Sequence, residues 1–220
     1  MNATAPIVVP ILATPFGVVP LPEAGALNAA LSSVFAARMA AESSAQANPL
    51  CYRSGDDLLE QPGEPLRQLA AAIFRGVYLV VESVNDFSSA QLRSFRMEAR
   101  SWFTIVKPDG CVPAASYPLT AWCGIYCVAA PAFAPTRADS GVLRIYESRL
   151  GTMFQDATNS VMRMPYKPSH CSWRPVAGQL AVFPASLTHE IALNRSAEPL
   201  VLVTVRVRFV GPGQQGMSRW

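Results

Sequence analysis

The sequence predicts an α+β fold that is mainly β, in which helices pack on one side of an antiparallel sandwich or barrel. Up to residue 85, apolar residues recur every three or four positions, as in helices, whereas after residue 95 they alternate, as in strands. Clusters of Pro, Gly and Asp separate the alternating segments. Helices that precede a run of short strands are typical of α+β architecture. Half of the residues are hydrophobic and 15% are charged, so the chain can bury a large core.

Two helices are expected, at residues 23–42 and 64–85. The first has apolar residues at spacings of three and four, with alanine at many of the other positions: Leu27, Leu31, Val34, Phe35 and Met39. The second has a longer apolar stripe: Leu66, Leu69, Ile73, Val77, Val80 and Val84. Gly76 is the weak position of this helix, because glycine lowers helix stability. The polar segment 43–63 between the helices is expected to be a loop.

The barrel is expected over residues 96–210, as six β-rich segments. They are 99–107, 121–129, 141–147, 171–176, 179–184 and 198–209. The last segment has two different faces: valines at 201, 203, 205 and 207 share one, and Leu200, Leu202, Thr204, Arg206 and Arg208 share the other. We expect the valine face to lie against packed protein. Residues 7–20 are an expected entry strand, which its prolines place at a sheet edge.

One domain over residues 1–210 and a flexible tail at 211–220 account for the length. The net charge of +3 and the 16 arginines, which form no run, argue against a nucleic-acid-binding stripe. The apolar N-terminus has no basic region and is interrupted by prolines, so neither a signal peptide nor a membrane span is expected. Five cysteines, none in a C-x-x-C pair, favour reduced thiols and a cytoplasmic location.

The chain has two histidines, and one of them is a candidate site residue. His189 lies in the stretch FPASLTHEIALN (183–194) and has three interpretations: a hydrogen-bonded residue near the barrel mouth, a weak metal ligand, or a catalytic acid/base. His170 is expected in an exposed loop. Cys123 and Cys127 share a strand face. They are either soft ligands for zinc or copper opposite His189, or small buried hydrophobic residues.

Six motifs, taken in their order, carry a resemblance to a known family. They are 10–15 (PILATP), 54–59 (SGDDLL), 101–110 (SWFTIVKPDG), 123–128 (CGIYCV), 141–149 (GVLRIYESR) and 175–189 (PVAGQLAVFPASLTH). Over nearly the whole chain they resemble a small bacterial family of 2-oxoglutarate/iron(II) oxygenases, and the last motif is the most specific. The resemblance implies a double-stranded β-helix, which is a jelly-roll or cupin-like barrel, with the two N-terminal helices packed on one sheet.

The same resemblance implies an iron site and a cosubstrate site, and the sequence retains little of either. Such enzymes hold iron(II) with two histidines and one carboxylate. His189 matches the distal histidine, but the preceding His-x-Asp pair falls on Ala115 and Tyr117, give or take a residue. No histidine or carboxylate occurs at residues 110–138. The arginine that binds 2-oxoglutarate falls on Leu200, whose side chain cannot pair with a carboxylate. Iron(II) and 2-oxoglutarate are therefore implied by the family but not supported by the residues present.

Four residues make up the candidate site. His189 and Tyr126 are the catalytic candidates, and His189 is also the only retained metal position. Arg206 and Tyr117 are the candidates for binding a cofactor or ligand. Tyr126 occupies a tyrosine position of the family strand, and Arg206 lies six residues beyond Leu200 on the same strand face. We expect all four side chains to line one pocket in the barrel.

Three functions of different classes follow from these residues. The first is an oxygenase-family protein with a degenerate iron site that binds a small-molecule ligand. The second is an active enzyme, either an oxygenase with an unusual ligand set or a metal-independent acid/base catalyst at His189. The third is a structural or interaction protein that forms a homodimer through an exposed sheet edge. Neither nucleic acid nor a membrane is an expected partner.

Overall fold

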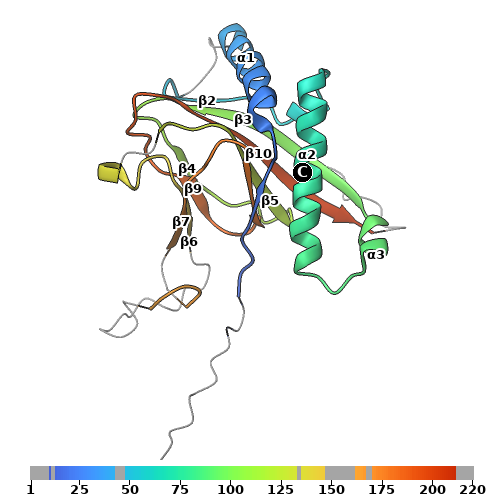
Figure 1. The fold of residues 1–220 in the computed structure, drawn as a ribbon. Coiled ribbons are helices and arrows are strands. Elements are labelled where there is room, and N and C mark those ends of the chain that lie inside the picture. The colour runs from blue at the N-terminus through green and yellow to red at the C-terminus, as the bar shows by residue number, and fades with distance from the viewer. Residues whose placement is uncertain are drawn as a thin grey trace, which may run out of the picture.

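The structure is a computed structural model that describes residues 10, 13–42, 48–132, 135–146, 162–166 and 170–211. It has two antiparallel sheets, with helices against one of them (Figure 1). This arrangement is the predicted double-stranded β-helix, mainly β, with helices packed on one sheet. Residues 7–9 of the expected entry strand and 212–220 of the expected tail lie outside the described residues.

The two sheets together form the barrel. The larger has six strands in the order β1-β8-β5-β10-β3-β2: Gly17–Pro20, Gln179–Pro184, Trp122–Ala129, Leu200–Val210, Arg96–Val106 and Cys51–Arg53. The smaller has four strands in the order β4-β9-β6-β7: Val112–Ala115, His189–Ile191, Leu143–Tyr146 and His170–Trp173. The described part of the entry strand, β1, lies at an edge of the larger sheet, as its prolines predict.

Helices α1 (Ala24–Glu42) and α2 (Glu64–Ser83) lie on the outer face of the six-stranded sheet, as predicted (Figure 1). Of the predicted α2 stripe, all residues but Val84 are buried, whereas only Leu31 and Phe35 of the predicted α1 stripe are. Leu27 and Met39 are partly buried, and Val34 is exposed. Helix α2 ends two residues earlier than predicted, and Val84 at its C-cap is exposed. No helix in the described ranges is long and apolar enough to cross a membrane.

Gly76 stands in α2 because the helix lies directly against the sheet at this point. A β-carbon at residue 76 would lie 2.6 Å from Cδ2 of Leu180 on β8. Carbon atoms in contact are normally about 3.5–4.0 Å apart, so a side chain here would push Leu180 aside. The residue that weakens the helix by its propensity is therefore explained by packing.

Strand β10 separates two cores, because its side chains alternate between the two faces of the sheet. The predicted valine face packs against α1 and α2, outside the barrel. On the other face, Leu200 and Leu202 pack inside the barrel with Cys123 and Phe183. Strand β10 pairs with β3 on one side and β5 on the other, so this alternation sets which residues of both neighbours face the interior.

Several short elements are absent from the sequence-based prediction: β2, β4, β9, helix α3 (Ser89–Arg93) and the 3₁₀ helices Leu58–Glu60 and Pro135–Arg137. Strands of three or four residues show too little alternation to be recognised. Helix α3 does have a sequence signature, a capping box in which Ser88 Oγ accepts from the Gln91 backbone and the Gln91 side chain accepts from the Ser88 backbone. His170 is exposed as expected, but it begins β7 instead of lying in a loop.

Tyr126 does not lie inside the barrel, which corrects the prediction. On β5, Cys123, Ile125 and Cys127 point into the barrel, so Tyr126 points toward the helices. Its hydroxyl donates a 2.6 Å hydrogen bond to Oδ1 of Asn28 on α1. Burial raises the pKa of Tyr126 to about 12. The buried pair links α1 to the sheet, and Tyr126 is not part of a pocket around His189.

Replacing Tyr126 with Phe is expected to destabilise the fold by about 1–2 kcal/mol, because Oδ1 of the buried Asn28 loses its donor. Urea unfolding measures the change. The double variant Tyr126→Phe, Asn28→Leu removes both polar partners and should recover part of the loss. An unchanged urea midpoint in the single variant would contradict this role of the pair.

Candidate functional site

A cavity inside the barrel contains His189. It has a volume of about 30 Å³, enough for a few water molecules. Strands β3, β5 and β10 of the larger sheet and β4 and β9 of the smaller sheet contribute to its walls. Most of the lining is apolar or aromatic, and includes Trp102, Val112, Tyr117, Ile125, Ile191 and Leu202. The polar side chains that face the cavity, His189, Thr104 and Thr204, can form hydrogen bonds with a ligand.

Strand β4 brings Ala115 and Tyr117 next to His189. Ala115 is the register partner of His189 on β9, and the strand pairing is irregular between Val112 and Ala115. The Tyr117 ring lies edge-on to the His189 ring, with centroids 5.5 Å apart. The positions where the family resemblance places the His-x-Asp pair are therefore beside His189 in space. They carry a methyl group and a phenol.

His189 is buried, and a backbone carbonyl fixes its ring. Nδ1 lies 2.9 Å from the carbonyl oxygen of Leu187, which can only accept, so Nδ1 carries the proton. Nε2 lies 3.9 Å from Sγ of Cys123. Burial lowers the pKa of His189, and the hydrogen bond to Leu187 opposes this effect. The imidazole is therefore neutral near pH 7, with Nε2 as its acceptor.

The two cysteines of β5 lie in the apolar interior. Burial raises the pKa of the Cys123 thiol, and it raises the pKa of the Cys127 thiol to about 12. Both residues pack among leucine, isoleucine and phenylalanine side chains inside the barrel. Because the thiolate, not the thiol, is the metal ligand, this environment favours the interpretation as small buried hydrophobic residues.

Two threonines add polar groups to the cavity. Thr104 on β3 and Thr204 on β10 are both more than nine-tenths buried and line the cavity. Neither hydroxyl forms a hydrogen bond with another residue in the described part of the chain. Buried polar groups normally have partners, so these hydroxyls are suited to bonding with water or a ligand. Together with Nε2 of His189, they suit a small polar group without charge.

The mouth of the barrel carries a cluster of arginine and aromatic side chains. The guanidinium carbon of Arg53 lies 4.3 Å from the Trp102 ring centroid, and that of Arg206 lies 5.4 Å from it. Arg206 also lies 4.8 Å from the ring centroid of Tyr117. The Asp56 carboxylate forms ion pairs with both arginines. Tyr117 therefore connects this cluster to the His189 cavity.

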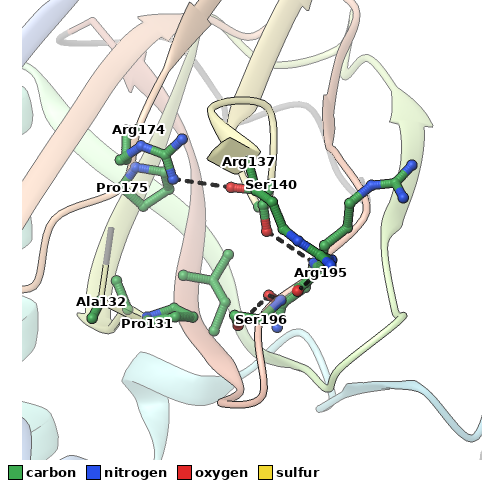
Figure 2. Close-up of a pocket in the computed structure, with 12 residues that line it drawn as sticks. Pro131, Ala132, Arg137, Ser140, Arg174, Pro175, Arg195 and Ser196 are labelled. Carbon is green, nitrogen blue, oxygen red and sulfur yellow. Dashed lines mark hydrogen bonds between the residues drawn. The ribbon is translucent and has the colours of Figure 1, made fainter. Parts of the chain in front are cut away.

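The opposite end of the barrel interior is apolar. Leu200, at the position that the resemblance assigns to the 2-oxoglutarate arginine, packs with Leu143 and Leu202. Leu200 also lines a second pocket of about 40 Å³ at this end of the barrel (Figure 2). The pocket position that the resemblance assigns to an arginine is therefore occupied by an apolar side chain, and Arg137, Arg174 and Arg195 line other parts of the pocket.

The second pocket is bordered by arginines that join the loops at this end. Arg174 donates a 3.0 Å hydrogen bond to the Ser140 carbonyl, and Arg137 donates a 3.1 Å bond to the Arg195 carbonyl (Figure 2). The backbone N–H of Arg195 donates to Oγ of Ser140 at 2.9 Å. The Arg195 side chain extends away from the pocket (Figure 2). These contacts hold the loops together at this end of the barrel.

Three of the four predicted site residues lie together. Tyr117 and His189 line the cavity, whereas Arg206 lies against the Tyr117 ring at the mouth and is not among the lining residues. Tyr126 is on the helix side of the sheet and is excluded from it. His170 lies on the edge strand β7 beside Tyr146, with ring centroids 6.1 Å apart, and does not line the cavity.

Sequence reasoning missed five further residues of the site. They are Arg53, Asp56, Trp102, Thr104 and Thr204. A signal existed for Trp102 and Thr104, which alternate with the outward-facing Phe103 on a recognised strand. Arg53 and Asp56 had no such signal, because strand β2 has only three residues and the segment was expected to be a loop.

Comparisons with known proteins identify the fold. No protein-family model and no curated protein matches the chain. A solved prolyl-4-hydroxylase from Pseudomonas putida has a TM-score of 0.58 and 14% identity, over 91% of this chain and 93% of that one. The α-ketoglutarate-dependent carbocyclase SnoK from nogalamycin biosynthesis has a TM-score of 0.61 and 11% identity, over 92% and 84%. HygX from Streptomyces hygroscopicus, solved with nickel and 2-oxoglutarate, has a TM-score of 0.56 and 11% identity, over 94% and 86%.

The fold is that of the 2-oxoglutarate/iron(II) oxygenases. The likeness extends over nearly the whole chain, so it includes the barrel and the helices that cover it. Because identities this low show a shared fold and not a shared activity, function has to be argued from this chain's own site. Within the described ranges, no three His, Cys, Asp or Glu side chains gather closely enough to hold a metal ion.

The buried His189 makes stability depend on pH. Its pKa is lower in the folded protein than in the unfolded chain, where it is about 6.5, so as the pH falls through this value the unfolded state takes up more protons and stability decreases. In the variant His189→Gln, the free energy of unfolding measured with urea should no longer show this part of its dependence on pH. His170→Gln, at the exposed histidine, is the matched control and should keep it. Equal slopes for wild type and His189→Gln would contradict a neutral, buried imidazole.

Proposed function

We propose that this chain is an oxygenase-like barrel that has left iron chemistry and binds a small molecule in the His189 cavity. The observation that carries the proposal is the register pairing of His189 with Ala115. At the place where such a barrel needs its second histidine, this chain has a methyl group. The barrel, its helices and the distal histidine position are kept, while the groups that would complete the metal site are replaced.

The described residues around His189 do not fit an iron(II) ion. A facial triad needs two imidazoles and a carboxylate directed at one point. Around His189 the neighbouring groups are the thiol of Cys123 and the rings of Tyr117 and Phe183, both edge-on to the imidazole. Nδ1 is already bonded to the Leu187 carbonyl. A buried protonated thiol and two ring edges do not replace an imidazole and a carboxylate.

Within the described part of the barrel, the residues do not fit 2-oxoglutarate either. This cosubstrate is a dianion, and burying a carboxylate without a charged or hydrogen-bonding partner is costly. Leu200 supplies only methyl groups where the resemblance places the cosubstrate arginine, and it packs with Leu202. Arg206, further along the same face of β10, lies at the mouth and is paired with Asp56. A ligand that suits the interior is therefore one whose buried part has no charge.

The cavity favours a small, uncharged polar group as the buried part of the ligand. Nε2 of His189 accepts a hydrogen bond, and the hydroxyls of Thr104 and Thr204 both donate and accept. A volume of about 30 Å³ holds a few heavy atoms, so the rest of a larger ligand would extend toward the mouth. An amide, an alcohol or a carbonyl group meets these requirements.

A metal-independent acid/base reaction at His189 is the second candidate function. The observation that favours it is a neutral imidazole with Nε2 at a ligand-accessible cavity, since such a group accepts a proton near pH 7. A purely structural protein has no need of a cavity with convergent polar groups. Catalysis and binding share the same cavity, so binding is the first property to measure.

The double variant Ala115→His, Tyr117→Asp should gain a divalent metal site, because it places the His-x-Asp pair beside His189. We expect about one cobalt(II) or iron(II) per chain in this variant and a much smaller fraction in wild type. Anaerobic equilibrium dialysis followed by metal analysis gives both values.

A matched control carries the same two substitutions together with His189→Ala and should lose the metal. Iron at full stoichiometry in wild type, lost in His189→Ala, would contradict the proposal that iron chemistry has been abandoned. A double variant that folds but gains no metal would show that Ala115 and Tyr117 are not the replaced ligand positions.

Ligand binding in the cavity should depend on His189. With butyramide as an uncharged probe, wild type should show NMR shift changes at cavity residues, and His189→Leu should bind about tenfold more weakly because one buried hydrogen bond is lost. His170→Gln should bind like wild type. Absence of shift changes around the cavity with butyramide and with 1-propanol would refute the binding function.

A further inference from the structure

Asp56 places a carboxylate between two arginines at the mouth of the His189 cavity. Its ion pair with Arg206 has an N–O distance of 3.5 Å, and it also pairs with Arg53. Further out, Arg208 pairs with Glu98 and Arg100 pairs with Glu60. Asp56 thus pairs with both guanidinium groups at the mouth. Two planar donor forks directed at one carboxylate form a typical anion-binding arrangement.

The sheet fixes the positions of the two arginines. Arg53 on β2, Trp102 on β3 and Arg206 on β10 all point to the inner face of the barrel, and β3 lies between the other two strands. Both guanidinium groups therefore lie against the ring of Trp102, because β2 and β10 each pair with the strand that carries it. Cation–π contacts orient guanidinium groups, so the pair is organised by the sheet and the ring as well as by Asp56.

The backbone around Asp56 is firmly held, whereas its side chain is free to turn. The Asp56 carbonyl accepts a 2.8 Å hydrogen bond from the backbone of Ser101. Two residues earlier, Ser54 exchanges hydrogen bonds of 3.0 Å with the backbone of Phe103. The Asp56 side chain is 42% exposed. Rotation about its side-chain bonds can therefore release the arginines without any movement of the loop.

We propose that the mouth is a carboxylate-binding site that Asp56 fills when no ligand is bound. The inference rests on the proposed function, because the same ligand places its uncharged end in the cavity. Tyr117 joins the two parts, since it lies under Arg206 and beside His189. The ligand class is a small monocarboxylate with a short arm, whose carboxylate takes the place of Asp56 between Arg53 and Arg206.

Exchange of the two carboxylates is energetically feasible. Asp56 and Arg53 are each more than two-fifths exposed, and ion pairs at such exposed positions contribute little to stability. The incoming carboxylate forms the same pairs, and its arm adds contacts in the cavity. Asp56 thereby makes the site selective. An anion that displaces Asp56 without also filling the cavity gains no binding free energy.

The test uses butyrate and butyramide, which have the same length and differ in charge. Binding is followed by NMR titration at low ionic strength, where charge interactions are least screened. Asp56→Asn should bind butyrate about fivefold more tightly than wild type, because the competing carboxylate is gone. Its affinity for butyramide should not change. Adding Arg206→Gln to Asp56→Asn should remove the gain.

Asp57→Asn is the matched control, because Asp57 contacts Arg38 and Gln61 instead of the mouth arginines. It should leave both affinities unchanged. Equal butyrate affinity in wild type and Asp56→Asn overturns the inference, and if butyramide still binds the cavity, the proposed function stands. A butyrate gain without butyramide binding supports the mouth site and overturns the proposed cavity function.

Discussion

The alternation of side chains along β10 is the constraint on which the rest of the structure depends. One face of this strand is packed under the helices and the other lines the barrel, so a shift of one residue would exchange the two cores. Through pairing with β3 and β5, the same alternation sends Trp102, Thr104 and Cys123 inward and Tyr126 outward. The register of the sheet therefore determines which side chains form the site.

The described interior of the barrel is packed mainly with apolar groups. Removing a charged centre and packing the space with apolar groups is often neutral or stabilising, because buried charges are costly to desolvate. Here Ala115, Cys123 and Leu200 occupy that interior, and the remaining His189 is kept neutral by burial. At the mouth, Arg206 and Asp56 are charged and partly exposed. The polarity of the site thus increases from the interior to the surface.

Sequence reasoning recovered the elements with long periodic patterns and the neighbourhood of His189. The two helices, the long strands and the valine face of β10 all have enough residues to show a period. Tyr126 was misplaced because a family position was followed in preference to the strand alternation, which puts it on the face opposite Cys123. Asp56 could not be predicted, because its role depends on a three-residue strand that brings Arg53 beside Trp102.

The central claim is that this fold has kept its barrel and lost its iron. A crystal structure of the wild-type protein, grown anaerobically with iron(II) and 2-oxoglutarate, tests it most directly. The account predicts no anomalous iron signal near Nε2 of His189, and the imidazole still facing Cys123 beside Ala115. An iron atom bonded to Nε2, with 2-oxoglutarate chelated to it, would contradict the account and would show that other residues complete the metal site.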